Sequence, residues 1–336
     1  LAGFVTSNVL PYGYSELGGF GRNPHGNFPC GGSSSGSAIA VAAGFCDAAL
    51  GTETRGSLMI PGFRNGVFSF KPSRGLVSRT GIIPLSSSFD APGVLARNPE
   101  ILREVFLFMV GVDPEDDQPF ELTKTESSFS RKRIVFCVNR KLGEMEMLQT
   151  KLHPFLSQLK LKGFEIAFID LPEVVFDYKT ISSADIRSDM TCFLQRFGSD
   201  NEPRSFEELV ERYRERPHAH LYGMERLEDA LAMPQITKPD LKKLVQENVA
   251  KARNLIDDIL AHYDADFVGF LNFVDWFSIG GGPSCTLPVS FETKPPISIM
   301  LGARVGNDLA ILHLVKELSE IAKAAQHVEK LGNKAE

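Results

Sequence analysis

This sequence has neither an excess of basic residues nor a long apolar run. Its 336 residues include 36 lysines and arginines against 42 acidic residues, and the net charge is −6. This balance provides no basic surface of the kind that nucleic acids require. No apolar run approaches the ~18 residues that a membrane-spanning helix needs. We therefore expect neither a nucleic-acid partner nor a membrane partner.

Cysteine is also scarce. The five cysteines are odd in number, include no Cys-x-x-Cys pair and are not spaced like metal ligands. This usage is typical of a reducing compartment, so we expect a cytoplasmic protein with free thiols, no metal and no cofactor. The opening residues, Leu1 to Val5, lack the basic and apolar segments of a signal peptide. They resemble instead a strand entered in the middle of a fold.

Apolar strands and amphipathic helices alternate along most of the chain. The expected strands are 47–51, 67–70, 134–138, 165–171, 266–271, 285–290 and 297–301. The expected helices are 99–110, 145–161, 206–214, 222–231, 241–262 and 308–323. This alternation predicts an α/β fold in which a mixed β-sheet core is covered by helices on both faces. The sequence contains no internal repeat.

Two loops rich in small residues stand out in the first hundred residues. Residues 31–37, Gly-Gly-Ser-Ser-Ser-Gly-Ser, lead into a small-residue segment, which predicts a short helix with Ser37 as its N-cap. Residues 51–57, Gly-Thr-Glu-Thr-Arg-Gly-Ser, end in Ser57, in a turn that Pro61 is expected to stop. Each loop places a serine hydroxyl on a backbone with little side-chain bulk.

A serine in such a turn can attack a carbonyl if two requirements are met. It needs a base that accepts its proton, and N–H donors that stabilise the oxyanion formed on the attacked group. The turn that ends in Arg55, Gly56 and Ser57 can supply the donors. The base is harder to nominate, because His25 is the only histidine near these loops and no lysine precedes Lys71.

Together with two further stretches, these loops resemble the amidase signature family. The stretches are 70–84, Phe-Lys-Pro-Ser-Arg-Gly-Leu-Val-Ser-Arg-Thr-Gly-Ile-Ile-Pro, and 90–97, Asp-Ala-Pro-Gly-Val-Leu-Ala-Arg. Order and spacing match the signature over residues 27–97, and residues 282–289 resemble the family's late strand beside the active site. The resemblance implies one amidase-signature domain over residues 1–336, incomplete at its N-terminus.

This resemblance implies an amidase that hydrolyses a carboxamide C–N bond through an acyl-enzyme. Ser57 matches the family's nucleophile, and Ser33 matches the bridging serine, whose peptide bond is cis. We expect the two hydroxyls to lie within hydrogen-bond reach, because proton relay needs contacts of ~2.6–3.2 Å, which are looser in an unliganded site. The backbone amides of Thr54, Arg55, Gly56 and Ser57 match the oxyanion-binding segment, and they are expected to converge beside Ser57. Glu53 and Arg55 make the sequence most similar to the peptide-amidase branch.

The family's third catalytic residue is a lysine that lies upstream of both serines. The resemblance implies that the segment carrying it is absent here, through truncation, processing or supply by a second polypeptide. Lys71, the first lysine, matches a scaffold position, although it remains an alternative base. We expect a small amide as substrate, and either a homodimer or a chain that supplies the missing segment as partner. An apolar surface near residues 1–10 would favour such an association.

Two other functions stay open. The chain can be a non-catalytic amidase-like protein used for binding or as a scaffold, or the amidase subunit of a multi-chain amidotransferase. The acidic charge, together with Glu53 and Arg55, argues against the latter.

Several side chains near the loops also have two interpretations. Arg55 is expected either to pair with Glu53 or to contact substrate. Cys30 is interpreted as a packed small residue. The aromatic segment around Asp275 and Trp276 predicts either a wall of the substrate cavity or an ordinary core cluster, which we favour.

Overall fold

The computed structural model describes residues 7, 11, 13–116, 131–216, 221–291 and 293–332, with side chains as far as residue 325. The strand expected at Leu1 to Val5 lies outside the described residues. So does the apolar surface expected near residues 1–10, apart from Ser7.

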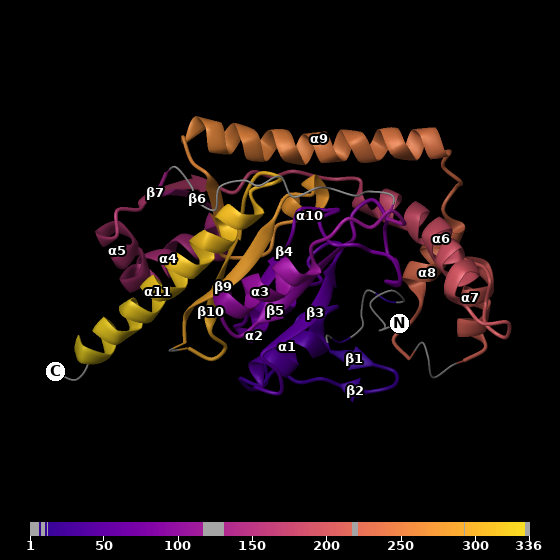
Figure 1. The fold of residues 1–336 in the computed structure, drawn as a ribbon, viewed down its shortest axis with the longest axis horizontal. Coiled ribbons are helices and arrows are strands. Elements are labelled where there is room, and N and C mark those ends of the chain that lie inside the picture. The colour runs from indigo at the N-terminus through magenta and orange to yellow at the C-terminus, as the bar shows by residue number, and fades with distance from the viewer. Residues whose placement is uncertain are drawn as a thin grey trace.

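A mixed eight-stranded sheet forms the centre of the molecule (Figure 1). Its strands, in chain order, are β3 (Ala48–Glu53), β4 (Phe68–Lys71), β5 (Ala91–Ala96), β6 (Arg133–Val138), β7 (Glu165–Asp170), β8 (Phe267–Phe270), β9 (Ser284–Ser290) and β10 (Ile297–Gly302). In space they follow the order β3-β5-β4-β9-β10-β8-β6-β7. Strand β6 runs parallel to β7 and β8, and the other neighbours are antiparallel. The predicted mixed sheet is confirmed.

Both faces of this sheet are buried under helices, as the sequence predicts. Along β6 the side chains alternate, so that Ile134 and Phe136 enter one apolar core while Val135 and Cys137 enter the other. The first core lies under α3 (Pro99–Met109), α4 (Glu144–Gln149), α5 (His153–Leu161) and α11 (Asp308–Gly332). The second lies under α1 (Ser35–Ala42), α2 (Met59–Asn65), α9 (Lys238–His262) and α10 (Trp276–Gly280).

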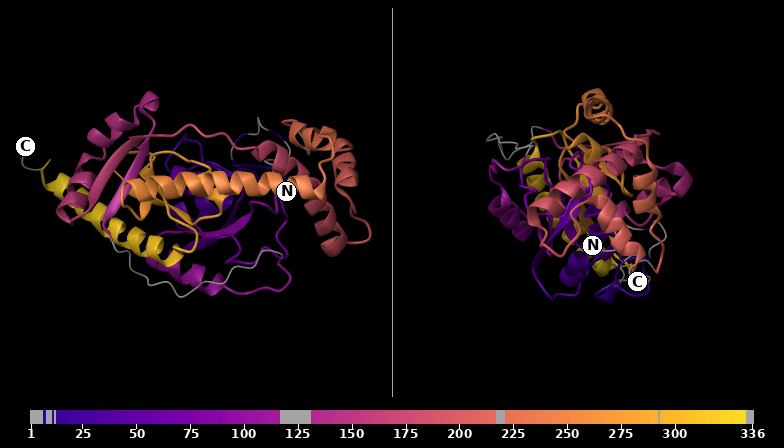
Figure 2. Two further views of the ribbon diagram at one scale, coloured as in Figure 1. Left: turned by 90° about the horizontal axis from the view of Figure 1, so that it is seen from above. Right: turned by 90° about the vertical axis from the view of Figure 1, so that its right-hand side faces the viewer.

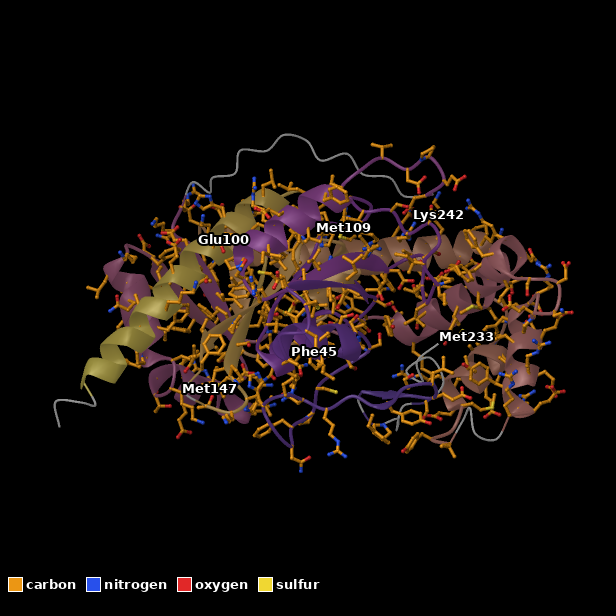
Figure 3. All side chains as sticks on the ribbon, turned by 60° about the horizontal axis from the view of Figure 1, so that its bottom comes forward. Phe45, Glu100, Met109, Met147, Met233 and Lys242 are labelled. Carbon is orange, nitrogen blue, oxygen red and sulfur yellow. The ribbon has the colours of Figure 1, made fainter. Side chains whose placement is uncertain are left out.

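A group of three helices extends from one side of this layered body. It consists of α6 (Tyr178–Phe197), α7 (Phe206–Arg214) and α8 (Glu225–Ala232), and it has a small apolar core of its own. The long helix α9 spans the distance between this group and the sheet (Figure 2). Met233, at the end of α8, lies in this group (Figure 3). A short hairpin of β1 (Tyr14–Ser15) and β2 (Gly19–Phe20) forms a second, separate sheet.

Three local expectations were wrong. Residues 145–161 form two helices, separated by Thr150 to Leu152, and Pro154 lies in the first turn of the second, where its missing N–H costs little. Pro61 likewise lies inside the first turn of α2 and does not stop it. Helix α1 begins at Ser35 with Ser34 at the N-cap position, because Ser37 instead donates its hydroxyl to Leu50 O at 2.7 Å.

Candidate active site

The two serines that the sequence singles out meet in one cavity. The N–H of Ser34 donates to Ser57 O at 2.9 Å, which ties the two loops together through their backbones. The Gly32–Ser33 peptide bond is cis, as predicted. Ser33 and Ser57 are both half-buried and line a cavity of about 670 Å³. Within the described residues, neither hydroxyl forms a hydrogen bond, and their approach within hydrogen-bond reach stays a prediction.

The start of α1 covers the outer edge of β3 and fixes the first loop. Ser34 Oγ accepts the N–H of Thr52 at 3.2 Å and donates to Thr52 O at 3.3 Å. Ser35 Oγ donates to Gly31 O at 2.6 Å. A side chain at Gly51 would place its Cβ 2.7 Å from Ser34 Oγ, so this close approach requires glycine. The serine-rich segment is therefore a packed loop and not a linker.

The second loop is organised by Glu53, which is fully buried at the end of β3. Its carboxylate accepts the N–H of Gly56, the N–H of Leu58 at 2.6 Å and the N–H of Met59 at 3.1 Å. It also accepts the hydroxyl of Ser278 at 2.8 Å. Four donors satisfy this buried charge, and they hold the turn that carries Ser57.

These contacts correct two expectations. Arg55 does not pair with Glu53; its Nε donates to Asp275 Oδ2 at 2.8 Å, and its guanidinium lies 4.9 Å from the centre of the Tyr178 ring. Gly56 does not offer its N–H to the cavity, because that N–H donates to Glu53. The amides of Thr54, Arg55 and Ser57 remain the predicted oxyanion donors, and all three residues line the cavity.

A third loop closes the cavity beside Thr54. Thr54 Oγ1 donates to Asp90 Oδ1 at 2.5 Å, and Asp90 Oδ2 accepts the N–H groups of Leu85 at 2.8 Å and Ser86 at 2.9 Å. Burial raises the pKa of Asp90, and the hydrogen bonds partly offset this effect. Asp90 therefore connects the turn of Ser57 to the segment that follows residues 70–84.

Helix α6 forms a large part of the cavity lining, and sequence reasoning missed it. It contributes Tyr178, Asp189, Cys192, Phe193, Arg196 and Phe197 to the lining. Its buried face includes Ser183 and Asp185 as well as Ile181, Ile186 and Met190. Because polar residues interrupt the apolar stripe, the helical period is weak in the sequence.

Lys71 does not line the cavity, which argues against its alternative role as the base. It is 1% exposed, and its Nζ donates to Pro72 O at 2.9 Å. Burial, with a smaller contribution from Arg74, lowers its pKa to about 7. The scaffold interpretation fits this position.

The stability of the wild type relative to a Lys71→Met variant is expected to increase as the pH rises from about 7 to about 10. In this range the folded state binds fewer protons at Lys71 than the unfolded state, whose lysine has its ordinary pKa of 10.5. Urea denaturation of both proteins at pH 6, 7.5 and 9 measures the difference. Lys151→Met, at an exposed position, is the control. If the difference in free energy of unfolding between the wild type and Lys71→Met does not change with pH, the pKa of Lys71 is not lowered by burial.

The remaining alternatives are settled by packing. Trp276 and Phe277 are buried in the second core, where each makes an edge-on contact with the Phe270 ring, so the core interpretation of this aromatic segment is confirmed. Cys30 is 2% exposed, and burial raises the pKa of its thiol, as expected for a packed residue.

Among the described residues, no group of histidine, cysteine and acidic side chains could hold a metal ion. None of the described helices has both the length and the apolar character needed to cross a membrane.

Comparison with known proteins agrees with this geometry. The chain is 25% identical to the pea (Pisum sativum) protein "Translocon at the outer membrane of chloroplasts 64", over 94% of this chain and 57% of that protein. It is 31% identical to a subunit of the glutamyl-tRNA(Gln) amidotransferase of Campylobacter concisus, over 61% of this chain and 50% of that protein. The chain thus spans about half the length of these relatives.

The fold has a close match among solved structures. The peptide amidase of Stenotrophomonas maltophilia superposes with a TM-score of 0.83 at 22% identity, over 95% of this chain and 72% of that chain. This likeness concerns the fold alone. The family model described as Amidase matches residues 6–269, which is well over half of the sequence. The chain belongs to the amidase family.

Proposed function

We propose that this chain carries the nucleophile, the proton-relay serine and the oxyanion donors of a carboxamide hydrolase. The observation that supports this proposal most is the shared cavity of Ser33 and Ser57, next to the backbone of Thr54 and Arg55. A hydroxyl nucleophile, a second hydroxyl and N–H groups in one cavity are the components that acyl transfer needs.

In the first half of the reaction, Ser57 Oγ attacks the carbonyl carbon of the amide. Its proton passes through Ser33 Oγ to a lysine amine, and the N–H groups of Thr54, Arg55 and Ser57 stabilise the oxyanion. When the C–N bond breaks, the same proton returns through Ser33 to the leaving nitrogen, which departs as a neutral amine or ammonia. An ester joins the acyl group to Ser57.

In the second half, water attacks that ester and loses a proton through the same relay. The tetrahedral intermediate collapses, Ser57 Oγ regains a proton, and the carboxylic acid leaves. The lysine is the third component of the proposed Ser–cisSer–Lys arrangement, and no residue before Lys71 provides it. We propose a single domain over residues 1–336, with the signature at 27–97, acting in the cytoplasm. The proposed partner is either a second copy of this chain or a different chain that supplies a lysine-bearing segment.

The test compares the chain alone with the chain joined to, or co-expressed with, a lysine-bearing N-terminal segment from a peptide amidase. General-base catalysis typically contributes ~10²–10⁴-fold, so we expect the chain alone to be slower by about that factor. Release of p-nitroaniline from amino-acid anilides measures turnover. Full turnover by the chain alone, abolished by Ser57→Ala, would show that another residue supplies the base. No turnover in either form would favour the non-catalytic interpretation.

A second candidate function is favoured by the 31% identity to a glutamyl-tRNA(Gln) amidotransferase component. A protein of that function would use glutamine as its amide. Ammonia release from free glutamine, compared with release from peptide amides by the same lysine-complemented protein, separates the two functions. A preference for glutamine would support the amidotransferase function and overturn the peptide-amidase-like one.

A further inference from the structure

We propose that Asp189 binds a positively charged group of the substrate, so that the cavity selects amides that carry an ammonium or guanidinium group. The proposal rests on the proposed function, because it assigns a substrate class to the same cavity. It concerns the part of the lining that α6 contributes, to which the hydrolytic mechanism gives no role.

Asp189 lies on α6 and lines the cavity with Ser33 and Ser57. It is half-buried, so a molecule in the cavity can reach it. Its Oδ2 accepts the N–H of Ser87 at 2.7 Å, and the Ser87 side chain also stabilises the carboxylate. Ser188 makes a long hydrogen bond of 3.4 Å to Oδ1. Because a carboxylate accepts about four hydrogen bonds, part of its capacity remains for a ligand.

A short series of contacts connects Asp189 to the nucleophile loop. Ser87, which donates to Asp189, follows Ser86, whose N–H donates to Asp90. Asp90 in turn binds the hydroxyl of Thr54, at the start of the loop that ends in Ser57. The carboxylate is therefore held on the same framework as the nucleophile. A cavity of about 670 Å³ is large enough for a small amide to contact both.

The arginines of the lining already have partners. Arg79 binds Asp116 at 2.5 Å, Arg196 binds Glu115, and Arg226 also has a partner. By contrast, within the described part of the chain, no lysine or arginine lies within ion-pair distance of Asp189. A half-buried carboxylate without a cation is costly, and a cationic ligand would compensate it.

The surroundings of Asp189 suit a cation with an apolar stem. Phe193 follows Asp189 by one helical turn, and its ring lies 5.0 Å from that of Phe197, centre to centre. Both rings line the cavity. The Arg196 guanidinium already lies 4.9 Å from the centre of the Phe197 ring, whereas Phe193 offers an aromatic surface of the kind that attracts ammonium and guanidinium groups. Burial and the nearby Asp185 raise the pKa of Asp189 to about 6, so the carboxyl is still mainly charged at neutral pH.

The test measures binding, which does not require turnover. In a Ser57→Ala background, isothermal titration calorimetry compares N-acetyl-lysinamide with N-acetyl-norleucinamide, which has the same stem without the charge. We expect the lysine amide to bind at least ~10-fold more tightly. Asp189→Asn is expected to abolish this preference while keeping the acceptor for Ser87 N–H, and Asp189→Glu to keep part of it. Asp47→Asn, in an exposed ion pair with Arg97, should leave it unchanged.

Equal affinity for the two amides would overturn the proposal, as would a preference that survives in Asp189→Asn. Failure of N-acetyl-lysinamide to bind at millimolar concentration would also overturn it. Circular dichroism and thermal melting of each variant confirm that the fold is retained. A protein that binds lysine amides selectively but hydrolyses nothing would contradict the proposed function and leave this inference intact.

Discussion

Replacing Ser57 by alanine is expected to lower amide turnover by ~10⁴-fold or more in a form of the protein that contains its base. The reason is that the variant can form no acyl-enzyme, whereas the cavity and the loops around it should persist. Hydrolysis of an amino-acid anilide measures the effect, and the melting temperature should change little because Ser57 is half-buried and its hydroxyl contacts no described partner.

Two further serine variants are compared with Ser57→Ala. Ser33→Ala should also reduce turnover strongly, by ~10²–10⁴-fold, because it removes the proton relay while the nucleophile stays in place. Ser37→Ala is the control. Ser37 lies in the first turn of α1, and its hydroxyl donates to Leu50 O, so this variant should retain most of the activity. Turnover in Ser57→Ala within tenfold of the wild type would mean that a different residue attacks the substrate.

Replacing Glu53 by alanine is expected to lower the free energy of unfolding by more than any other single change near the site. The variant leaves the N–H groups of Gly56, Leu58 and Met59 buried without acceptors. An unsatisfied buried group costs ~1–3 kcal/mol, so the three together should cost about 3 kcal/mol or more. Turnover should fall as well, because the same N–H groups position the turn that carries Ser57.

Urea denaturation measures this loss of stability, and two further variants are compared with Glu53→Ala. Glu53→Gln keeps one carbonyl oxygen and the size of the side chain, so it should cost less than alanine. Glu173→Ala, at an exposed position with a weak ion pair to Lys141, should change stability by no more than ~0.5 kcal/mol. If Glu53→Ala unfolds at the same urea concentration as the wild type, the carboxylate does not organise the loop.

Seven of the eight strands could be predicted from the sequence, and most of these are buried on both faces. Strand β5 was not among the expected strands. Segments such as Ile134 to Val138 are continuous apolar runs, which is typical of strands buried on both faces. The position of the two serines could be predicted because the spacing of the motifs in residues 27–97 carries that information. Neither prediction required knowledge of distant contacts.

The parts of the site that could not be predicted depend on residues far apart in the chain. Glu53 is held by Ser278, and Arg55 by Asp275, and nothing in the local sequence indicates either partner. Helix α6 was missed for a similar reason. Its buried Asp185 accepts the hydroxyl of Ser86 and the N–H of Ser88, so a polar residue occupies a position where the helical period requires an apolar one.

The most direct measurement is to locate the acyl group after reaction with an activated ester. The protein is incubated with p-nitrophenyl butyrate, quenched in acid and digested, and its peptides are identified by mass spectrometry. An activated ester needs little help from a base, so the chain itself can be used. We predict a butyryl group on the peptide that contains Ser57, and its absence in Ser57→Ala. A butyryl group on Ser33 or on the exposed Cys192 in place of Ser57, or no acylation at all, would contradict Ser57 as the nucleophile.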